Sequence, residues 1–552
     1  MGFNVSVVQG EKVNKIYADT PIMGHEVLAL SDIGDDERRL VIAWRVNRIL
    51  RPMSWVVDDD ADVEFVDTSS FEGTEIYRST LTFLLVLACK RALGRDVAVM
   101  YSMNESYYCE FPGLAATEED VAKVREEMNK IVNSSLPIQM ATLPLDKARR
   151  IFERQGNEDR ARLIQSVGAD PVMLYRCAGI YGYFGVPLAA TTAILKTFDL
   201  NWFEPGFLLR FPSITASGVL PPIQIVPKLM DVFREYSKWL GVLGLSTMDS
   251  LHNRVAKGKS LDLILISEAF HGEALSRIAN HIIGRGTVRL VCLAGPSSSG
   301  TTTTSKRLSI QLQVSGKNPV ALALDNYYVD RDKTPLDENG NYDFEALEAL
   351  DIDLINEHIS ALLAGEEVSL PRFDFVAGVR KPGPKLRLSL NDILIIEGIH
   401  GLNDKLTRDI PPESKCKVFI SPLTGVNLDS HNRIGTTDTR LLRRIVRDYR
   451  TRGHSPERTL LMWPSVIKGS HKHIFPYEEG ADLMFNSSLV YEISVMKGYA
   501  EPLLRAIPET SPAYGEASRL LSMLRFAPVI PSENVPNLSI LREFIGGGCF
   551  ED

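Results

Sequence analysis

A glycine-rich turn between an apolar run and a helical segment carries the clearest chemistry in this sequence. The turn reads Gly295-Pro-Ser-Ser-Ser-Gly-Thr-Thr-Thr-Thr304, an apolar run at residues 288–294 precedes it, and a helix is expected from Thr302 to about Gln313. Strand, turn and helix in this order form an anion site, because the N–H groups of the turn and the positive end of the helix dipole converge. The sequence therefore predicts phosphate binding at this turn.

The turn departs from the phosphate-loop pattern G-x-x-x-x-G-K-[ST] at one position. Gly295 and Gly300 fill the glycine positions and Thr302 offers the hydroxyl expected to bind Mg2+, but Thr301 stands where the pattern has lysine. Loss of one charge-stabilising donor slows a reaction by roughly 100- to 1000-fold. Lys306 lies more than a helical turn further on and is not expected to replace it.

Eight residues of the turn and the helix start are expected to contact the phosphates. They are Gly295, Ser297, Ser298, Ser299, Gly300, Thr301, Thr302 and Thr303.

A second predicted strand, at residues 319–324, ends directly before Asp325. Groups at the carboxyl ends of strands in an open α/β sheet face the ligand crevice. A carboxylate there lies across from the phosphate loop and can accept a proton from an attacking hydroxyl. We therefore expect Asp325 to be a general base.

Length and composition narrow the class of protein. The chain has 552 residues, 44% of them hydrophobic and 24% charged, which predicts three or four folded domains. A formal charge of -9 argues against a general nucleic-acid or membrane-surface binder. The six cysteines are scattered without C-x-x-C spacing, and no leader or long apolar segment is found. We expect a cytoplasmic protein without a membrane partner; a homo-oligomer is compatible with the sequence, which does not specify one.

Five further motifs follow the phosphate loop: Asp337-Glu-Asn-Gly-Asn-Tyr-Asp-Phe344, Pro371-Arg-Phe-Asp-Phe375, Arg380-Lys381, Ile393-Leu-Ile-Ile-Glu-Gly-Ile399 and Asp438-Thr-Arg-Leu-Leu-Arg-Arg-Ile-Val-Arg-Asp448. With these motifs in this order, residues 287–500 resemble the uridine kinases and uridine-cytidine kinases. The resemblance implies transfer of a phosphoryl group from ATP or GTP to a nucleoside 5′-hydroxyl, with Mg2+ and a uridine- or cytidine-like substrate.

The resemblance also implies roles for single residues. Glu397 would hold Mg2+ together with Thr302, and Asp343 would accept hydrogen bonds from ribose hydroxyls. Tyr328 and Phe373 would contact the substrate, Phe373 by stacking on the base. Arg444 and Arg452 would stabilise the transferring phosphate, and Arg444 would also approach the substrate; the other arginines of this segment, Arg440, Arg443, Arg447 and Arg450, are interpreted mainly as a solvated helix face.

Three further departures blur the choice of base. Gly378, His454 and Met462 stand where the family has a histidine, an arginine and a glutamine. A site without those hydrogen-bonding groups cannot discriminate in the same way. Another nucleoside or a related polyol stays open as the substrate.

Short apolar stretches near the amino terminus (3–8, 39–44 and 46–50) surround one helix-like stretch (25–31), and a long helical pattern (76–92) and the stretches 107–111 and 174–179 follow. With this pattern the amino-terminal part resembles the first two domains of threonyl-tRNA synthetases. Residues 1–67 look like their ubiquitin-like β-grasp (TGS-like) domain, and residues 68–225 look like their α+β editing domain. The editing family has two histidines on a helix and a cysteine followed by a histidine; here the positions hold Ser79, Phe83, Cys177 and Tyr181. We therefore expect the fold without editing chemistry, as a scaffold or a small-molecule pocket without metal.

The predicted architecture is an α/β phosphate-loop kinase with a parallel sheet at residues 286–505, preceded by the two synthetase-like domains and a helical linker at 226–285. A carboxyl-terminal helix and tail follow at 506–552, of which residues 538–544 are expected to pack back on the kinase domain.

Two functions stay open. One is an active nucleoside kinase, favoured by Asp325, Asp343 and Glu397; the other is a nucleotide-binding regulatory protein with impaired catalysis, favoured by Thr301. A third, tRNA binding or editing, is disfavoured by the missing ligand residues and the acidic charge. The sequence does not say whether Thr301 is natural or a deliberate replacement, or what the amino-terminal domains bind.

Overall fold

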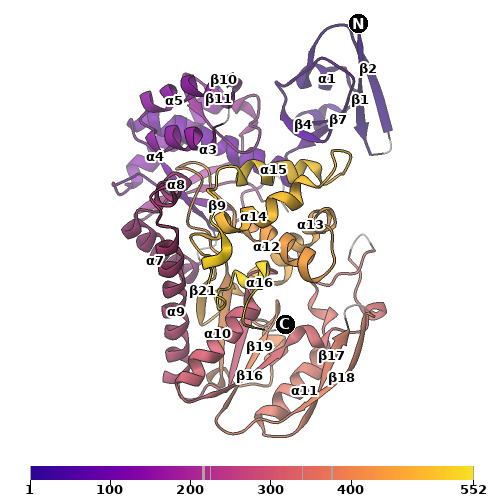
Figure 1. Cartoon of the computed structure of the whole chain (residues 1–552). Coiled ribbons are helices and arrows are strands. Elements are labelled where there is room, and N and C mark those ends of the chain that lie inside the picture. The colour runs from indigo at the N-terminus through magenta and orange to yellow at the C-terminus, as the bar shows by residue number, and fades with distance from the viewer. Residues whose placement is uncertain are drawn as a thin grey trace.

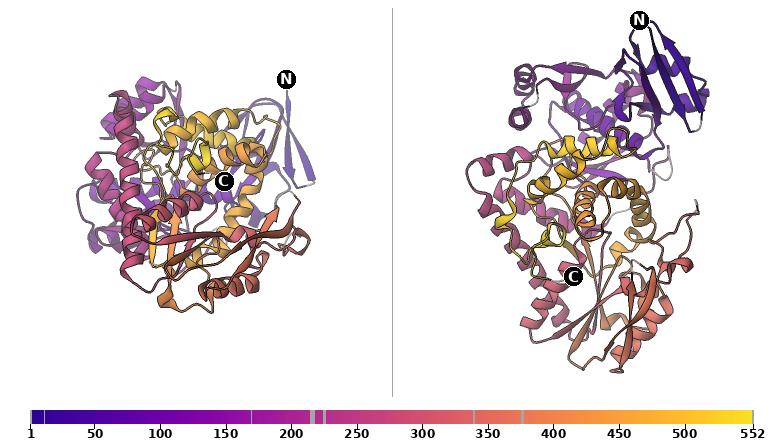
Figure 2. Two further views of the ribbon diagram at one scale, coloured as in Figure 1. Left: turned by 60° about the horizontal axis from the view of Figure 1, so that its bottom comes forward. Right: turned by 45° about the vertical axis from the view of Figure 1, so that its right-hand side comes forward.

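The computed structural model describes residues 2–10, 12–168, 170–213, 218–223, 226–337, 340–374 and 377–550. The molecule is elongated, with the amino-terminal sheet at one end and the sheet that carries β16 and β19 towards the other (Figure 1). The carboxyl-terminal residues return to the middle, between these two ends, in both further views (Figure 2).

The first sheet is mixed, because β1 and β7 run parallel while the other pairs are antiparallel. Its order is β2-β1-β7-β4-β5, and the buried Trp44 lies in its core together with Val27 of the helix α1 (Gly24–Leu30). Its assignment to the ubiquitin-like class stays a prediction. The strands are β1 (Phe3–Gln9), β2 (Lys12–Ala18), β4 (Val41–Val46), β5 (Ile49–Pro52) and β7 (Ala61–Asp67).

The next region is built on one long helix, α3 (Phe71–Leu93). The Ser70 side chain caps its start by accepting a hydrogen bond from the Gly73 N–H at 3.1 Å, and Gly94 ends it in the left-handed conformation. Two sheets, β10-β11-β12 and β13-β14-β9-β8, complete this region. Their strands are β8 (Ala98–Ser102), β9 (Ser106–Glu110), β10 (Gln139–Leu143), β11 (Val172–Cys177), β12 (Ile180–Gly182), β13 (Asp199–Phe203) and β14 (Gly206–Arg210), and the helices are α4 (Glu118–Asn133), α5 (Leu145–Arg154) and α6 (Glu158–Val167).

Three helices join this region to the second half of the chain: α7 (Pro227–Leu243), α8 (Met248–Ala256) and α9 (Ser260–Gly284). They run down one side of the molecule in Figure 1. Apolar residues of α8 and α9 share one core with residues of the second half, among them Leu251, Ile264, Leu293 and Leu308.

The second half contains a five-stranded sheet of order β16-β19-β15-β20-β21, in which every neighbouring pair is parallel. This sheet confirms the predicted α/β class with a parallel sheet. Its strands are β15 (Leu290–Ala294), β16 (Asn318–Ala323), β19 (Asp392–Glu397), β20 (Lys415–Ser421) and β21 (Leu483–Asn486), and the helices around it are α10 (Thr301–Val314), α11 (Ile352–Leu363), α12 (Thr436–Thr451), α13 (Pro456–His473) and α14 (Glu492–Arg505). An antiparallel hairpin, β17 (Val368–Asp374) and β18 (Val379–Leu386), extends from it.

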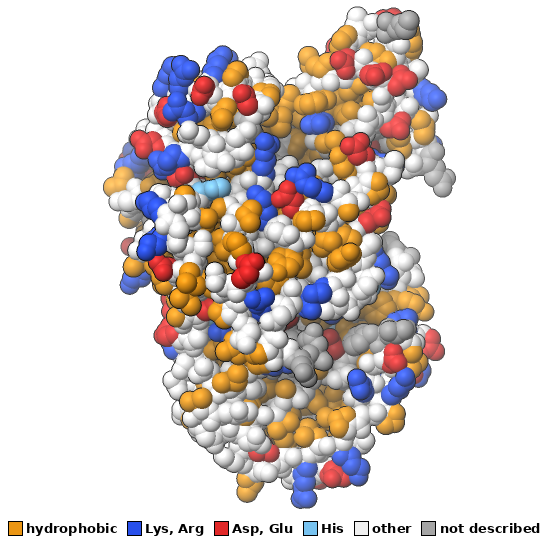
Figure 3. All heavy atoms as spheres, in the orientation of Figure 1, with side chains coloured by type: hydrophobic (Ala, Val, Ile, Leu, Met, Phe, Trp, Pro, Cys, Tyr) orange, Lys and Arg blue, Asp and Glu red, His pale blue; other side chains and the backbone are white. Residues whose placement is uncertain are grey.

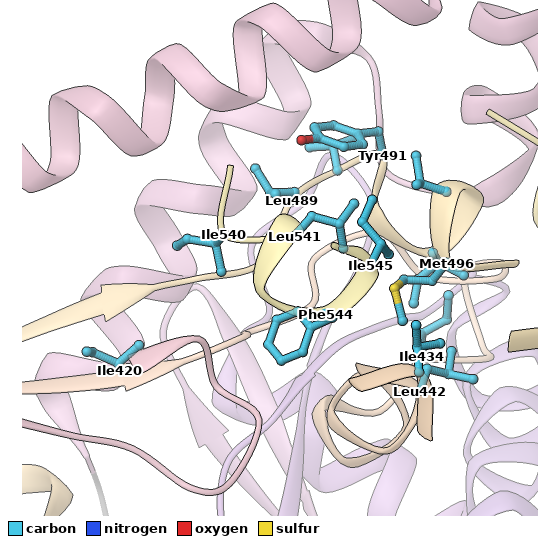
Figure 4. Close-up of a cluster of buried hydrophobic side chains, with 14 of the residues drawn as sticks. Ile420, Ile434, Leu442, Leu489, Tyr491, Met496, Ile540, Leu541, Phe544 and Ile545 are labelled. Carbon is cyan, nitrogen blue, oxygen red and sulfur yellow. The ribbon is translucent and has the colours of Figure 1, made fainter. Parts of the chain in front are cut away.

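The carboxyl-terminal residues belong to the core of the second half. After α15 (Tyr514–Leu524) the chain reaches the short helix α16 (Arg542–Ile545), whose neighbours Ile540 and Leu541 are buried, as is Phe544. Figure 4 shows these side chains in one cluster of buried residues that also contains Leu442 of α12 and Met496 of α14. The predicted packing of residues 538–544 is thus confirmed, although Leu538 itself is exposed.

Side chains of both charges lie on the face of the molecule that Figure 3 draws, where basic and acidic residues are interspersed. Within the described ranges, no helix combines the length and the apolar character that crossing a bilayer requires.

A buried ion pair connects the two halves. Arg160 of α6 donates to the Asp429 carboxylate through Nη2 at 2.9 Å and Nε at 3.2 Å, and both side chains are 1% exposed. Arg160 Nη2 also lies 2.7 Å from Nδ1 of His431, whose pKa is lowered to about 3 by burial and by the guanidinium, so the ring is neutral and Nδ1 can accept. The pair therefore satisfies a buried charge from each half.

We predict that Arg160→Ala destabilises the chain strongly, because Asp429 would be left buried without its partner. Breaking one side of such a pair costs roughly 3–5 kcal/mol in free energy of unfolding. Urea denaturation followed by tryptophan fluorescence measures the change, and Arg154→Ala, at an exposed position of α5, is the control, expected within about 0.5 kcal/mol of the wild type. Equal denaturation midpoints for the two variants would contradict the role of the pair.

Candidate functional site

The glycine-rich turn lies where the sequence places it, between β15 and the start of α10. Gly300 has a φ of 85° and Ser298 a φ of 66°, so two residues of the turn are left-handed. A Cβ atom on Gly295 would lie 2.0 Å from the Ile420 carbonyl oxygen of β20, so no larger residue fits there. The backbone conformation at Gly300 and the close carbonyl at Gly295 therefore explain why both positions hold glycine. Neither reason depends on the residue at position 301.

Three arginines of α12 hold the turn from behind. Arg440 Nε donates to the Ser297 carbonyl and Arg444 Nη1 to the Ser297 hydroxyl, both at 2.9 Å. Arg443 Nη1 donates to the carbonyls of Ser298 and Ser299 at 3.3 and 3.2 Å. The interpretation of Arg440 and Arg443 as part of a solvated face is wrong, since they are 1% and 0% exposed.

Arg443 needs a counter-charge at that depth and finds it in Glu492 of α14. Both ends of the guanidinium donate to the Glu492 carboxylate, the Nη2 to Oε2 distance being 2.8 Å. A buried charge is tolerated only when it is paired and hydrogen-bonded in this way. Side chains from α12 and α14 together fix the shape of the turn.

Glu397 and Thr302 meet beside the turn. The register pairs Glu397 with Leu293 of β15 and with Ala323 of β16, so it ends the middle strand between them. The Thr302 hydroxyl donates to Glu397 Oε1 at 3.4 Å, while Oε2 is buried and has no hydrogen-bond partner in the part of the chain that is described. Loss of solvation and the nearby charges of Asp325 and Glu543 raise the pKa of Glu397 to about 8.

These oxygen atoms fit a hard divalent cation. Mg2+ takes oxygen ligands and is commonly held by one or two side chains together with substrate phosphates. A hydroxyl beside a carboxylate that keeps one buried, unpaired oxygen is such a donor set. Thr302 and Glu397 are therefore the residues that would hold the metal.

Asp325 lies in a turn of 3₁₀ helix (Leu324–Tyr327) directly after β16. Its side chain is exposed, yet surrounding protein raises the pKa of its carboxyl, and the charges of Arg452 and Arg447 act in the opposite direction. Because Asp325 in turn raises the pKa of Glu397, the two carboxylates are electrostatic neighbours. Arg452 also lies near Asp448, with 3.7 Å between Nε and Oδ1.

The residues expected at the acceptor side form a second group. The rings of Tyr328 and Phe373 are 5.7 Å apart, and the Tyr328 hydroxyl donates to the Phe344 carbonyl at 3.1 Å. Asp343 accepts from the Glu345 N–H at 3.1 Å and lies 3.8 Å from Nε2 of His473. Three residues of the quoted motifs, Glu338, Asn339 and Phe375, lie outside the described residues.

Glu345 interacts with residues beside the phosphate loop and with residues of the acceptor side, and the sequence patterns did not predict this role. Loss of solvation and the carboxylates of Asp325 and Asp343 raise its pKa to about 7, while Arg440 and Arg444 oppose the rise. It therefore lies between the arginines behind the turn and the acidic residues in front of it. Its place two residues after Asp343 was the only signal available.

The carboxyl-terminal segment, defined here as residues 539–550, was also not assigned to the site. The Thr303 N–H, in the first turn of α10, donates to Glu543 Oε2 at 3.0 Å. The position of a Cβ on Gly300 would lie 2.5 Å from Cγ2 of Ile540. The segment thus lies directly on the phosphate loop. The residues in contact are about 240 positions apart in the sequence, so no local pattern predicts this arrangement.

The positions of the editing residues fall in two environments. Phe83 and Cys177 are buried in the core of the amino-terminal half, where loss of solvation raises the pKa of the thiol. Ser79 lines a cavity of about 130 Å³ that residues of α3, α12 and α15 help to enclose, and Arg433 and Asp438 also line it. This cavity contains none of the residues predicted to bind nucleotide.

Comparison with known proteins agrees with the geometry of the second half. The model of the family described as "Phosphoribulokinase / Uridine kinase family" matches residues 290–494. The uridine kinase of Halobacterium salinarum is 30% identical over 194 residues, which cover 35% of this chain and 77% of that protein. The chain belongs to the phosphoribulokinase/uridine kinase family. Membership of this kinase family supports a phosphotransferase that uses a nucleotide.

Outside the phosphoribulokinase/uridine kinase region, the amino-terminal part matches a threonine–tRNA ligase of Acidithiobacillus ferrooxidans. The two are 28% identical over 172 residues, which cover 31% of this chain and 27% of the ligase. Among solved structures, a putative fructose transport system kinase from Silicibacter sp. TM1040 is 17% identical and covers 38% of this chain and 98% of its own, with a TM-score of 0.26.

Glu345 generates a prediction about pH. The folded chain keeps the proton of Glu345 up to about pH 7, whereas an unfolded chain releases it near pH 4.3. The wild type should therefore lose stability as pH rises through this window, by at most about 1.4 kcal/mol per pH unit. Glu345→Gln carries no such proton, so its melting temperature should gain on the wild type between about pH 4.5 and 7 and then stay level.

Thermal unfolding of both proteins from pH 5 to 8 measures this difference. Glu348→Gln, at an exposed position three residues further on, is the matched control and should follow the wild type at every pH. A difference between Glu345→Gln and the wild type that is constant over the whole range would show that Glu345 is ionised normally.

Proposed function

We propose that this chain transfers the γ-phosphoryl group of ATP, or GTP, to the 5′-hydroxyl of a nucleoside resembling uridine or cytidine. The observation that carries the proposal is the meeting of Thr302, Glu397 and Asp325 beside the phosphate loop. A metal-binding pair and a free carboxylate at the carboxyl edge of a parallel sheet are the groups that phosphoryl transfer to an alcohol requires.

In this proposal each group has a separate task. Asp325 accepts the proton of the attacking hydroxyl, and its exposed position leaves room for the acceptor. Thr302 and Glu397 would hold Mg2+, which would neutralise charge on the phosphates. Asp343 orients ribose hydroxyls, and the Tyr328 and Phe373 rings bound the place of the base.

Positive charge for the transferring group comes from α12 in this proposal. Arg444 reaches the Ser297 hydroxyl, and the charge of Arg452 acts on Asp325. Preorganised cations near the transferred phosphate lower the barrier even when the loop lysine is missing. Gly295 and residues 297–303, the eight residues expected to contact the phosphates, are assigned that role in this proposal.

A second function, nucleotide binding with impaired catalysis, is supported by Thr301. A threonine cannot supply the ammonium that the family pattern places on the β- and γ-phosphates. The amino-terminal half, with its synthetase-like sequence, would then act as a docking or sensing part. Both functions are compatible with the proposed domain boundaries at residues 67, 225, 285 and 505 and with the proposed cytoplasmic location.

We predict that Asp325→Asn lowers turnover by roughly 100- to 10,000-fold, because an amide cannot accept the hydroxyl proton. ATP binding should stay unchanged. Coupled measurement of ADP formation with a panel of nucleosides gives the rate, and Asp332→Asn, exposed seven residues further on, is the control. Full turnover in Asp325→Asn would remove Asp325 from the mechanism.

A second prediction separates the two functions. Thr301→Lys should raise turnover by roughly 100- to 1000-fold if the site is otherwise competent, since it restores the missing donor. Thr301→Gln has a similar length without the charge and should not raise it. An assay in which Thr301→Lys binds ATP but stays as slow as Thr301→Gln would favour the regulatory function.

A further inference from the structure

The carboxyl-terminal segment places a carboxylate at the start of the phosphate-binding helix. Glu543 Oε2 accepts from the Thr303 N–H at 3.0 Å. The first N–H groups of a helix have no partner within the helix and bind anions, because the helix dipole adds to their own polarity. Glu543 thus uses a donor that the phosphate loop would offer to a nucleotide.

The position of Glu543 is fixed by the chain around it. Arg450 of α12 donates to the carbonyls of Glu543 and Phe544 at 3.0 and 3.1 Å. The Arg443 guanidinium lies 4.9 Å from the centre of the Phe544 ring, and Phe544 is 0% exposed. The close-up in Figure 4 shows Phe544 and Ile545 among the side chains of this core.

The charge of Glu543 is felt across the site. Together with loss of solvation and Asp325, it raises the pKa of Glu397. Glu543 thus places a carboxylate on the Thr303 N–H and acts on Glu397, beside the loop where a negatively charged triphosphate would lie. A phosphate and the Glu543 carboxylate are both negatively charged and repel each other at close range. They therefore cannot both accept from the Thr303 N–H.

We propose that Glu543 holds the anion position of the phosphate loop, and that a nucleoside triphosphate binds by displacing its carboxylate. Glu543 is then the residue that sets nucleotide affinity from outside the kinase motifs. This inference rests on the proposed function, because it takes the loop to be the triphosphate site. The displacement needs only the side chain of Glu543 to turn away, so the apolar anchors of the segment can stay in place.

The test compares the wild type with Glu543→Gln, which keeps the shape of the side chain and removes its charge. The control is Glu533→Gln, at an exposed position of the same carboxyl-terminal stretch. Isothermal titration with ATP and, separately, with tripolyphosphate gives the dissociation constants. Thermal unfolding of each variant verifies that it is folded.

We expect Glu543→Gln to bind both ligands at least about tenfold more tightly than the wild type, and Glu533→Gln to bind like the wild type. Equal affinities in all three proteins would overturn the inference and leave the proposed function standing. If Glu543→Gln gained affinity for tripolyphosphate while no protein bound ATP, the competition would hold and the proposed function would fall.

Discussion

The buried contact between the arginines of α12 and the carbonyl groups of the phosphate loop is the interaction on which the site depends. Guanidinium groups of Arg440 and Arg443 bind loop carbonyls, and the paired Glu492 makes the charge of Arg443 tolerable in the core. Because carbonyls bound from behind cannot turn towards the ligand, this contact constrains the peptide groups of the loop. The loop before α10 is thereby held against the charged side chains of α12.

Residues of α12 and of the stretch before it also bind the carboxyl-terminal part of the chain and the amino-terminal half. Arg450 of α12 binds the backbone at Glu543 and Phe544, while Asp438, in the first turn of α12, pairs with Arg519 of α15 at 3.1 Å between Oδ2 and Nη1. Asp429, a few residues before α12, pairs with Arg160 of the synthetase-like region. Helix α12 and the residues before it therefore contact the phosphate loop, the carboxyl-terminal part of the chain and the synthetase-like region.

Much of this was predictable where it depended on local pattern. The strand, turn and helix around Gly295, and the acidic residues that end β16 and β19, follow from apolar runs and turn residues. The burial of Arg440 and Arg443 was not, because helical spacing gives the face of an arginine but not what covers it. The roles of Glu345 and Glu543 were not predictable for the same reason. Their neighbours include residues far away in sequence, and local periodicity gives no information about such neighbours.

The side chain of Thr301 is partly exposed and forms no hydrogen bond with any described residue, in contrast to the sterically enclosed Gly295. Among the described residues, no side-chain hydrogen bond of the loop therefore depends on the residue at position 301. An exchange of threonine and lysine there would change the charge offered to the phosphates and leave those hydrogen bonds in place.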